Sequence, residues 1–308
     1  MMGSMSPDEL KETVSRGLLA FPLTDFNASN EFDPRAHAAR IEWLSGQGAA
    51  AFFSAGGAGE FFSLSKAEYL EVIHTAVTAS GSAMPIIASA GYGTRLAIEY
   101  VQEAERLGVD GILLLPPYLT EATQEGLRDH ITAVCRSTRL GVIVYNRANC
   151  QPNAETLDRI AETCPNFVGF KDGVGNMETL LSVRSRLNGR LAMINGMPTA
   201  EVYARSYRTI GIPAYSSAVF NFAPRSATAF YGAVLGDDLE TYDAFVTNFL
   251  LPYLKIRGRQ PGYAVSIVKA GAEIVGRSAG KVRPPLSDLT PQEYEELSSL
   301  IARLGPQE

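Results

Sequence analysis

FVGFK at residues 167–171 and GVIVY at residues 141–145 decide the fold, because each is a short apolar run that ends in one polar side chain. Both runs are rich in β-branched or aromatic residues, which is typical of buried parallel strands. Side chains alternate along a strand, so Lys171 shares a face with Gly169, and Tyr145 shares a face with Ile143. If the two strands are neighbours, about 4.8 Å apart, the amine and the phenol can meet over one cavity.

Similar runs recur along the chain and alternate with segments of helical spacing. The eight predicted strands are Gly17–Phe21, Ala49–Ser54, Pro85–Ser89, Gly111–Leu115, Gly141–Tyr145, Phe167–Lys171, Leu191–Asn195 and Gly211–Ser216. The helical segments between them include Ala36–Gly46, Lys66–Ala79, Leu96–Leu107, Gly126–Ser137 and Glu155–Thr163. This alternation predicts parallel pairing and a (β/α)8 TIM barrel, for which about 250 residues is typical. An open, doubly wound sheet is the alternative.

The remaining segments suggest additions at both ends of the barrel. We expect an N-terminal leader and helix over 1–16, with Met1–Met5 flexible, and the barrel over 17–236. A C-terminal helical extension follows over 237–308, with predicted helices Leu239–Lys255, Ala264–Val275 and Pro291–Leu304. No linker rich in glycine, serine or proline separates these helices from the barrel, so a second independent domain is not expected.

Composition excludes several classes of partner. The chain has 308 residues, 46% of them hydrophobic and 19% charged, and a net charge of −6. Its basic residues form no cluster longer than Lys255–Arg259, so no nucleic acid is expected as a partner. The sequence also has no apolar run of about 20 residues and no signal-peptide core, so no membrane partner is expected. Cys135, Cys150 and Cys164 lack metal-binding spacing, and a reducing cytoplasm suits such thiols.

Lys171 is the candidate nucleophile. A lysine with the reference pKa of about 10.4 is protonated at neutral pH, but apolar barrel walls can lower that value to about 7–8. The alternative is a lysine that reaches the barrel rim or pairs with Asp172. Tyr145 is the candidate proton shuttle, although it could also close the barrel top with its hydroxyl bonded to the backbone. The three histidines fall inside predicted helices, so we expect no metal site.

The segment SAGGAGE at residues 54–60 follows the second predicted strand. It matches neither a P-loop nor the GxGxxG pattern, because Phe62 occupies the last glycine position. Successive small residues expose backbone N–H groups, which can bind a carboxylate. Gly56, Gly57 and Ala58 are therefore candidate substrate-binding residues, with a simple tight turn as the alternative.

Several strings from different parts of the chain resemble one family. They are AGGAGEFFSL from Ala55, LLLPPYLTEATQEGL from Leu113, GVIVYNR from Gly141, GFKDG from Gly169, NGMPTAEVY from Asn195, YSSAVFNF from Tyr215, GYAVSIVKAG from Gly262 and VRPPL from Val282. In order and spacing they resemble the dihydrodipicolinate synthase/N-acetylneuraminate lyase superfamily, and within it the 5-dehydro-4-deoxyglucarate dehydratase family. The similarity spans roughly Gly17 to Leu304.

The resemblance implies a Schiff-base lyase that acts on a small sugar diacid. Such an enzyme removes water and carbon dioxide from 5-dehydro-4-deoxy-D-glucarate and gives 2,5-dioxopentanoate, with no metal or organic cofactor. It also implies a cytoplasmic homotetramer built from two dimers. An aldolase of the same superfamily that cleaves or joins pyruvate remains an alternative, as does a barrel protein without catalytic activity.

The chain departs from the synthase pattern at several positions. Gly57 and Ala58 stand where the synthases have two threonines, of which the dehydratases usually keep the second. Leu119 stands where the synthases have a tyrosine that relays protons between subunits, and Cys150 replaces their carboxylate-binding arginine. Both of these changes argue against the synthase reaction. Arg147 could bind the distal carboxylate of the substrate instead, or form a salt bridge at the rim.

Polar residues at the later strand ends complete the predicted site. Asn195, Ser216, Ser217 and Asn221 could donate hydrogen bonds to substrate hydroxyls, or could pack the strand ends without touching substrate. Arg283, in the VRPPL string, could anchor the C-terminal tail.

Overall fold

Eight parallel strands close into a barrel, which confirms the predicted fold and rules out the open sheet. The computed structural model describes residues 5–117 and 121–307. The strands are β1 (Leu18–Ala20), β2 (Ala51–Ser54), β3 (Ile86–Ala90), β4 (Gly111–Leu114), β5 (Gly141–Asn146), β6 (Phe167–Asp172), β7 (Ala192–Asn195) and β8 (Ala214–Ser217). Each strand pairs with the next in sequence, and β8 pairs with β1.

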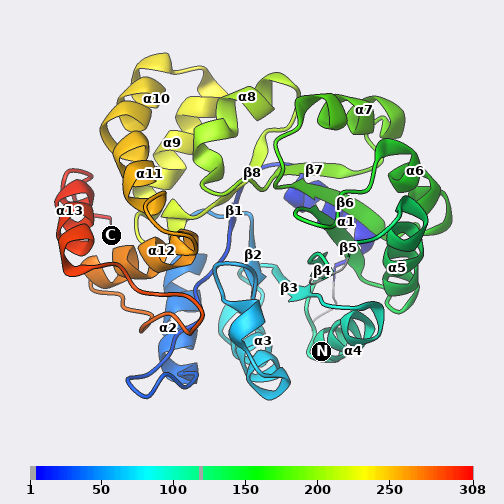
Figure 1. Ribbon diagram of the computed structural model, residues 1–308, viewed down its shortest axis with the longest axis horizontal. Coiled ribbons are helices and arrows are strands. Elements are labelled where there is room, and N and C mark those ends of the chain that lie inside the picture. The colour runs from blue at the N-terminus through cyan, green and yellow to red at the C-terminus, as the bar shows by residue number, and fades with distance from the viewer. Residues whose placement is uncertain (1–4, 118–120, 308) are drawn as a thin grey trace.

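Helices between the strands form an outer ring around the barrel (Figure 1). They are α2 (Pro34–Ser45), α3 (Lys66–Ser80), α4 (Thr94–Arg106), α5 (Gln124–Arg136), α6 (Ala154–Thr163), α7 (Met177–Leu187), α8 (Ala204–Thr209) and α9 (Pro224–Gly236). Sequence signals fix where several of them begin. Ser65, for example, accepts a hydrogen bond from the Glu68 backbone, and the Glu68 side chain accepts one from the Ser65 backbone, which is a capping box.

The first helix, α1 (Pro7–Val14), closes the N-terminal end of the barrel. Leu10 and Val14 are fully buried and pack with the side chains that fill the barrel interior. Gly111 and Gly141 begin β4 and β5, and a Cβ atom at either position would lie within 2.7 Å of the Leu10 side chain. The absence of side chains at these two strand starts therefore makes room for the helix.

Four C-terminal helices gather on one side of the barrel, beside α9 and α2 (Figure 1). They are α10 (Leu239–Phe245), α11 (Leu251–Arg257), α12 (Tyr263–Ile274) and α13 (Pro291–Ala302). The sequence predicts one continuous helix over Leu239–Lys255, but the structure has a π-helical turn, Val246–Leu250, between α10 and α11. Pro252 explains the difference, because it has no N–H group for the regular helical hydrogen bond. Among the helices that the structure describes, none has the length and apolar character needed to cross a membrane.

Two packed regions hold the fold together. The barrel interior contains aromatic and aliphatic side chains from alternate strand positions, including Phe21, Phe53 and Ile143. A larger core lies between the outside of the sheet and the surrounding helices. The alternation places every second residue of a strand in one region or the other, and this decides which polar strand-end residues face the cavity.

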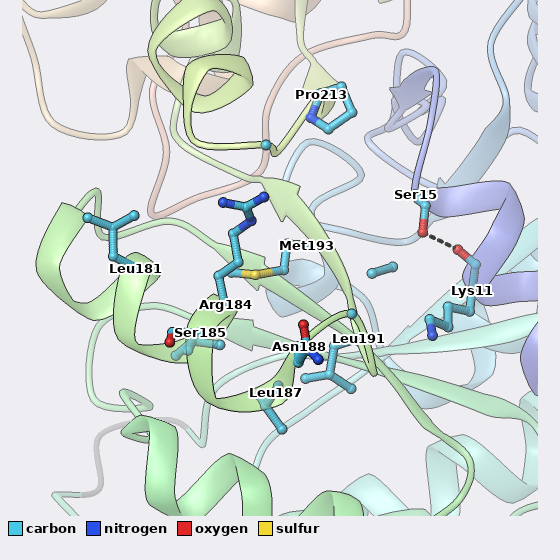
Figure 2. A pocket seen from close by; sticks show the side chains of 14 residues that line it. Lys11, Ser15, Leu181, Arg184, Ser185, Leu187, Asn188, Leu191, Met193 and Pro213 are labelled. Atoms are coloured by element: carbon cyan, nitrogen blue, oxygen red, sulfur yellow. Dashed lines mark hydrogen bonds between the residues drawn. The ribbon is translucent and has the colours of Figure 1, made fainter.

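A hollow of about 820 Å³ opens at the other end of the barrel, where β7 and β8 begin (Figure 2). Lys11 and Ser15 line it from α1, and Arg184 lines it from α7. None of the predicted site residues borders this hollow. It lies at the end of a TIM barrel that contributes to stability rather than to chemistry.

Candidate active site

Lys171 and Tyr145 are direct cross-strand partners on β6 and β5, as the sequence predicts. Both face the barrel interior at the carboxyl ends of the strands, where TIM barrels carry their chemistry. The Lys171 Nζ atom lies 3.5 Å from the centre of the Tyr145 ring and 4.9 Å from the centre of the Phe21 ring. The amine and the phenol therefore meet over one cavity.

The amine of Lys171 is buried against aromatic rings. The residue is only 4% exposed, so it does not reach the barrel rim. Burial lowers the pKa of its amine below the usual lysine value, and the neighbouring Tyr145 opposes this effect only in part. No carboxylate oxygen of the described residues lies within 4 Å of Nζ. A neutral amine in an apolar wall is the form that attacks a carbonyl group.

Asp172 does not form the ion pair considered as an alternative for Lys171. It follows Lys171 on β6, so its side chain points to the outer side of the sheet. There its carboxylate accepts hydrogen bonds from the Asn146 side chain, the Gly175 N–H and the Tyr207 hydroxyl. The carboxylate is thus engaged elsewhere.

The Tyr145 hydroxyl has a polar environment that can move a proton. It donates to the Gly196 carbonyl oxygen at 3.0 Å and accepts from Arg147 Nη1 at 3.4 Å. Burial alone would raise the pKa of the phenol, but the positive charges of Lys171 and Arg147 bring it below the usual tyrosine value. The backbone bond also fits the alternative of a tyrosine that closes the barrel top, so the shuttle role stays a prediction.

Two glycines complete the wall around this pair. A Cβ atom at Gly173 would lie 2.8–3.1 Å from the ring and hydroxyl of Tyr145. A Cβ atom at Gly196 would lie 2.5–2.8 Å from the Lys171 side chain. Only a residue without a side chain fits at either position. Sequence reasoning missed both, although Gly173 closes the GFKDG string.

The glycine-rich segment after β2 lies against the same cavity. A Cβ atom at Gly56 would lie 2.9 Å from the ring of Phe21, the ring that also faces Lys171 Nζ. Nothing lies within 4 Å of a Cβ position at Gly57, and Ala58 is half-buried. Within the described residues, the N–H groups of Gly57 and Ala58 donate to no protein oxygen, so they are available to an anion.

Arg147 lies at the rim of the site, in a tight turn after β5. Its backbone exchanges two hydrogen bonds of 3.0 Å with Cys150, and the intervening Ala148 has a φ of +50°. The turn directs the guanidinium group back over the Tyr145 ring, 6.0 Å from its centre. No acidic side chain in the described part of the chain forms an ion pair with Arg147, which favours substrate binding over the salt bridge considered from sequence.

The other predicted binding residues divide by the face of the strand that carries them. Ser216 lies on the inner face of β8, the same side of the sheet as Lys171, and is half-buried. Ser217 points to the outer side and donates to the buried carboxylate of Glu201 at 2.6 Å. Asn195 likewise bonds to the Ala200 carbonyl oxygen and the Met197 N–H. Packing of strand ends therefore accounts for Ser217 and Asn195, whereas Ser216 stays a candidate.

Asn221 connects the segments that follow the first and last strands of the barrel. Its side-chain amide donates to the Phe21 carbonyl oxygen at 3.1 Å, and its oxygen accepts from the Leu23 N–H at 3.2 Å. These bonds connect the turn after β8 to the segment after β1, which again favours packing. Tyr118 and Leu119, both in the LLLPPYLTEATQEGL string, lie outside the described residues.

Phe21 is a further residue beside Lys171 that sequence reasoning missed. Its ring stacks on Phe53 with a centroid separation of 4.6 Å, and the ring centre lies 4.9 Å from Lys171 Nζ. The sequence contained a signal for Phe21: it ends the first predicted strand two residues after Leu19, so both side chains lie on the same, inward face. A rule of alternation applied to every strand would have found it.

Comparison with known proteins relates the chain to one family. The model of the dihydrodipicolinate synthetase family matches residues 14–304. A Pseudomonas putida protein named 5-dehydro-4-deoxyglucarate dehydratase is 55% identical over 98% of this chain and 100% of its own length. A Leptothrix cholodnii protein named probable 5-dehydro-4-deoxyglucarate dehydratase is 56% identical over the same shares.

Solved structures show the same architecture. The 4-hydroxy-tetrahydrodipicolinate synthase of Methylacidiphilum fumariolicum SolV has a TM-score of 0.84 at 25% identity, covering 94% of this chain and 95% of that one. Dihydrodipicolinate synthase from Oceanobacillus iheyensis has a TM-score of 0.88 at 22% identity, covering 96% and 98%, and this likeness concerns the fold alone. Because the family model matches nearly the whole length of this chain, the chain belongs to the dihydrodipicolinate synthetase family.

Proposed function

We propose that this protein is a Schiff-base lyase that converts 5-dehydro-4-deoxy-D-glucarate to 2,5-dioxopentanoate, carbon dioxide and water. The observation that carries the proposal is the buried Lys171 amine, 3.5 Å from the Tyr145 ring centre and without a carboxylate partner among the described residues. The relatives that are 55–56% identical over nearly the whole chain carry the name of this activity. Together they support a reaction class and a substrate.

The reaction begins when the neutral Lys171 amine attacks the keto group beside one carboxylate. Loss of water from the resulting carbinolamine gives an imine, with Tyr145 moving the proton. The imine makes the adjacent methylene acidic, and removal of its proton expels the β-hydroxyl group as a second water molecule. The product of this step is a conjugated iminium ion.

The conjugated iminium ion accepts the electron pair that decarboxylation releases. The bond to the distal carboxylate breaks, carbon dioxide leaves, and the electrons move along the conjugated chain to the imine nitrogen. Reprotonation and hydrolysis then release the product from Lys171 and consume one water molecule. The net balance is loss of one carbon dioxide and one water, and these steps require no metal or organic cofactor.

Binding of the two carboxylates follows the charge distribution of the site. The free N–H groups of Gly57 and Ala58 suit the carboxylate beside the keto group. Arg147, which has no acidic partner among the described residues, suits the distal carboxylate. Ser216, on the inner face of β8, suits a substrate hydroxyl. Ala58 lacks the threonine hydroxyl usual in the family, so backbone groups carry more of the anion binding here.

A product assay with borohydride trapping tests the proposal. With 5-dehydro-4-deoxy-D-glucarate, we expect carbon dioxide and an aldehyde product, and reduction should add a covalent mass to Lys171. Release of pyruvate would instead support the aldolase alternative, and an unmodified lysine without any product would support a barrel protein with no catalytic activity.

We also propose that the protein is a cytoplasmic homotetramer, a dimer of dimers, that acts in glucarate or galactarate catabolism. The support for the compartment is that Cys135, Cys150 and Cys164 are buried, unpaired thiols, which suits a reducing environment. The support for the assembly is family resemblance. Light scattering that gives the mass of a monomer would refute the tetramer.

A further inference from the structure

A polar cluster lies on the outer side of the sheet, directly behind the Lys171 and Tyr145 pair. Asn146 and Asp172 are cross-strand partners one residue further along β5 and β6. Their side chains point away from the cavity, and the Asn146 amide donates to Asp172 Oδ1 at 2.6 Å. The proposed catalytic pair and this outer pair are thus joined through the same two strand ends.

The Asp172 carboxylate collects four hydrogen bonds although it is only 1% exposed. Besides Asn146, the Tyr207 hydroxyl on α8 donates at 2.5 Å. The N–H groups of Gly175 and Val174, in the loop after β6, donate at 2.9 and 3.3 Å. One carboxylate therefore fixes a strand, a loop and a helix in relation to each other.

The backbone of Asp172 extends this connection to the partner of the Tyr145 hydroxyl. The Gly196 N–H donates to the Asp172 carbonyl oxygen at 2.6 Å, and the Gly196 carbonyl oxygen accepts from Tyr145. On the other side, the Gly173 N–H donates to the Asn146 carbonyl oxygen at 2.9 Å, and Gly173 lies against the Tyr145 ring. Both backbone segments that confine Tyr145 are held by residues of the outer cluster.

We infer that Asp172, held by Tyr207 and Asn146, is a positioning residue for the Schiff-base chemistry: it keeps Tyr145 and Lys171 in register and places a negative charge behind the amine. This inference rests on the proposed function. The four donors come from β5, the loop after β6 and α8, so the carboxylate ties these segments to the strand end that carries Lys171. Reacting groups misplaced by about 1 Å can cost about 100-fold in rate. A small displacement of the strand ends that carry Tyr145 and Lys171 should therefore lower the rate of the reaction.

The charge of Asp172 also affects the pKa of Lys171. The charged or titratable groups that face the amine are Tyr145 and Arg147 from β5 and its turn, and Asp172 from β6. Burial lowers the amine pKa most, Arg147 lowers it further, and Tyr145 and Asp172 raise it. Removing the Asp172 charge should therefore move the pKa of Lys171 further down.

Two matched pairs of variants test the inference. Tyr207→Phe and Asp172→Asn alter the cluster, whereas Tyr263→Phe and Glu293→Gln alter a second buried pair in which a tyrosine hydroxyl donates to a carboxylate at 2.8 Å, in the C-terminal helices. All four variants are compared by melting temperature and by kcat and KM for 5-dehydro-4-deoxy-D-glucarate. The pKa of Lys171 is measured separately, from the pH dependence of its methylation by formaldehyde and cyanoborohydride, followed by mass spectrometry.

We expect Tyr207→Phe to lower kcat about tenfold with little change in KM, whereas Tyr263→Phe melts lower to a similar extent and keeps its kcat. Asp172→Asn should shift the methylation profile of Lys171 to lower pH, and Glu293→Gln should not. The inference is overturned if Tyr207→Phe retains wild-type kcat or if the Asp172→Asn profile does not move. Failure of the proposed function looks different: the wild type would neither turn over the substrate nor form an adduct with it, while the methylation profiles would still decide whether Asp172 acts on Lys171.

Discussion

The molecule contains two buried lysines with opposite surroundings, Lys171 on β6 and Lys269 on α12. They are 4% and 3% exposed, and each amine lies over an aromatic ring, Tyr145 at 3.5 Å and Phe26 at 4.1 Å. Lys269 also lies 2.8 Å from Glu60 Oε1 and donates to the Lys281 carbonyl oxygen at 2.9 Å. Lys171 has no such acidic partner among the described residues.

The difference shows that burial alone does not identify a reactive amine. Burial lowers the pKa of both lysines, but the chief opposing group is the Glu60 carboxylate for Lys269 and the Tyr145 phenol for Lys171. Lys269 thus has an ion-pair partner, which is typical of a buried lysine with a structural role. Lys171 instead faces a phenol rather than a carboxylate.

The two lysines are nevertheless connected through one loop. Glu60 ends the glycine-rich segment after β2, has a φ of +54° and is fully buried. Its second oxygen accepts from the Arg283 N–H at 2.9 Å. The structural lysine thus holds the end of the segment whose N–H groups suit a substrate carboxylate.

Replacing the two lysines one at a time gives the sharpest test of the comparison. Lys171→Met should lower kcat by about 10⁴-fold or more, because no other group forms the imine. It should also raise the free energy of unfolding at neutral pH, since an amine that burial destabilises is removed. The measurements are carbon dioxide release and unfolding by urea. Retained turnover in this variant would remove Lys171 from the mechanism.

Lys269→Met should have the reverse effects. It leaves Glu60 buried without its cation, so we expect a loss of about 3–5 kcal/mol in the free energy of unfolding. The folded fraction should keep most of its imine formation with substrate, because Lys171 is untouched. Chemical denaturation and borohydride trapping measure the two effects.

The double variant Glu60→Gln with Lys269→Met serves as the control for the Lys269 prediction. Since it removes both charges, it should recover most of the lost stability. If the single and double variants were equally unstable, the ion pair would not be the cause of the destabilisation.

The pH dependence of stability provides a third comparison. The folded-state pKa of Lys171 lies below its unfolded value, so the unfolded state binds more protons, and folding becomes more favourable as the pH rises through the folded pKa towards about 10. The lowered pKa of Tyr145 acts in the same direction. The wild type should therefore gain stability relative to Lys171→Met with rising pH, by up to about 1.4 kcal/mol per pH unit for each proton released. Parallel stability curves for the two proteins would contradict a lowered lysine pKa.

The contrast also explains how much the sequence could predict. Lys171 was found because it ends an apolar strand, and strand alternation placed it beside Tyr145 correctly. Lys269 lies inside a predicted helix, Ala264–Val275, where the sequence gives no sign of its partner. Its burial depends on Glu60, about two hundred residues away, and on the tail around Lys281 that covers it. Contacts of that range leave no periodic signal in a single sequence.

The same reason explains the mixed result for the later strand ends. All eight strands were located to within a few residues, but the last was predicted to start at Gly211 and begins at Ala214. The residue type of Ser217 and Asn195 suggested substrate binding, but their positions along the strands direct both side chains to the outer side of the sheet. Alternation tells which residues of a strand share a face, but pairing with the neighbouring strands decides which face turns inward.

The smallest predicted effect concerns Arg283, which lies 4.0 Å from the centre of the same Phe26 ring as Lys269. Its guanidinium group donates to both oxygens of Glu68 and to the carbonyl oxygens of Asn30 and Ser63, which confirms the expected tail anchor. Arg283→Lys keeps the charge but loses the planar guanidinium group, so we expect a loss of about 1–2 kcal/mol in the free energy of unfolding at neutral pH, with kcat unchanged.

The hydrogen bonds from Arg283 lower the pKa of Glu68 from 4.5 to about 2. This stabilising contribution is therefore complete above pH 4.5 and disappears as the pH falls towards 2. The stability difference between wild type and Arg283→Lys should shrink over that range, and a difference that stayed constant would show that the tail is held by packing on Phe26 rather than by the ion pair.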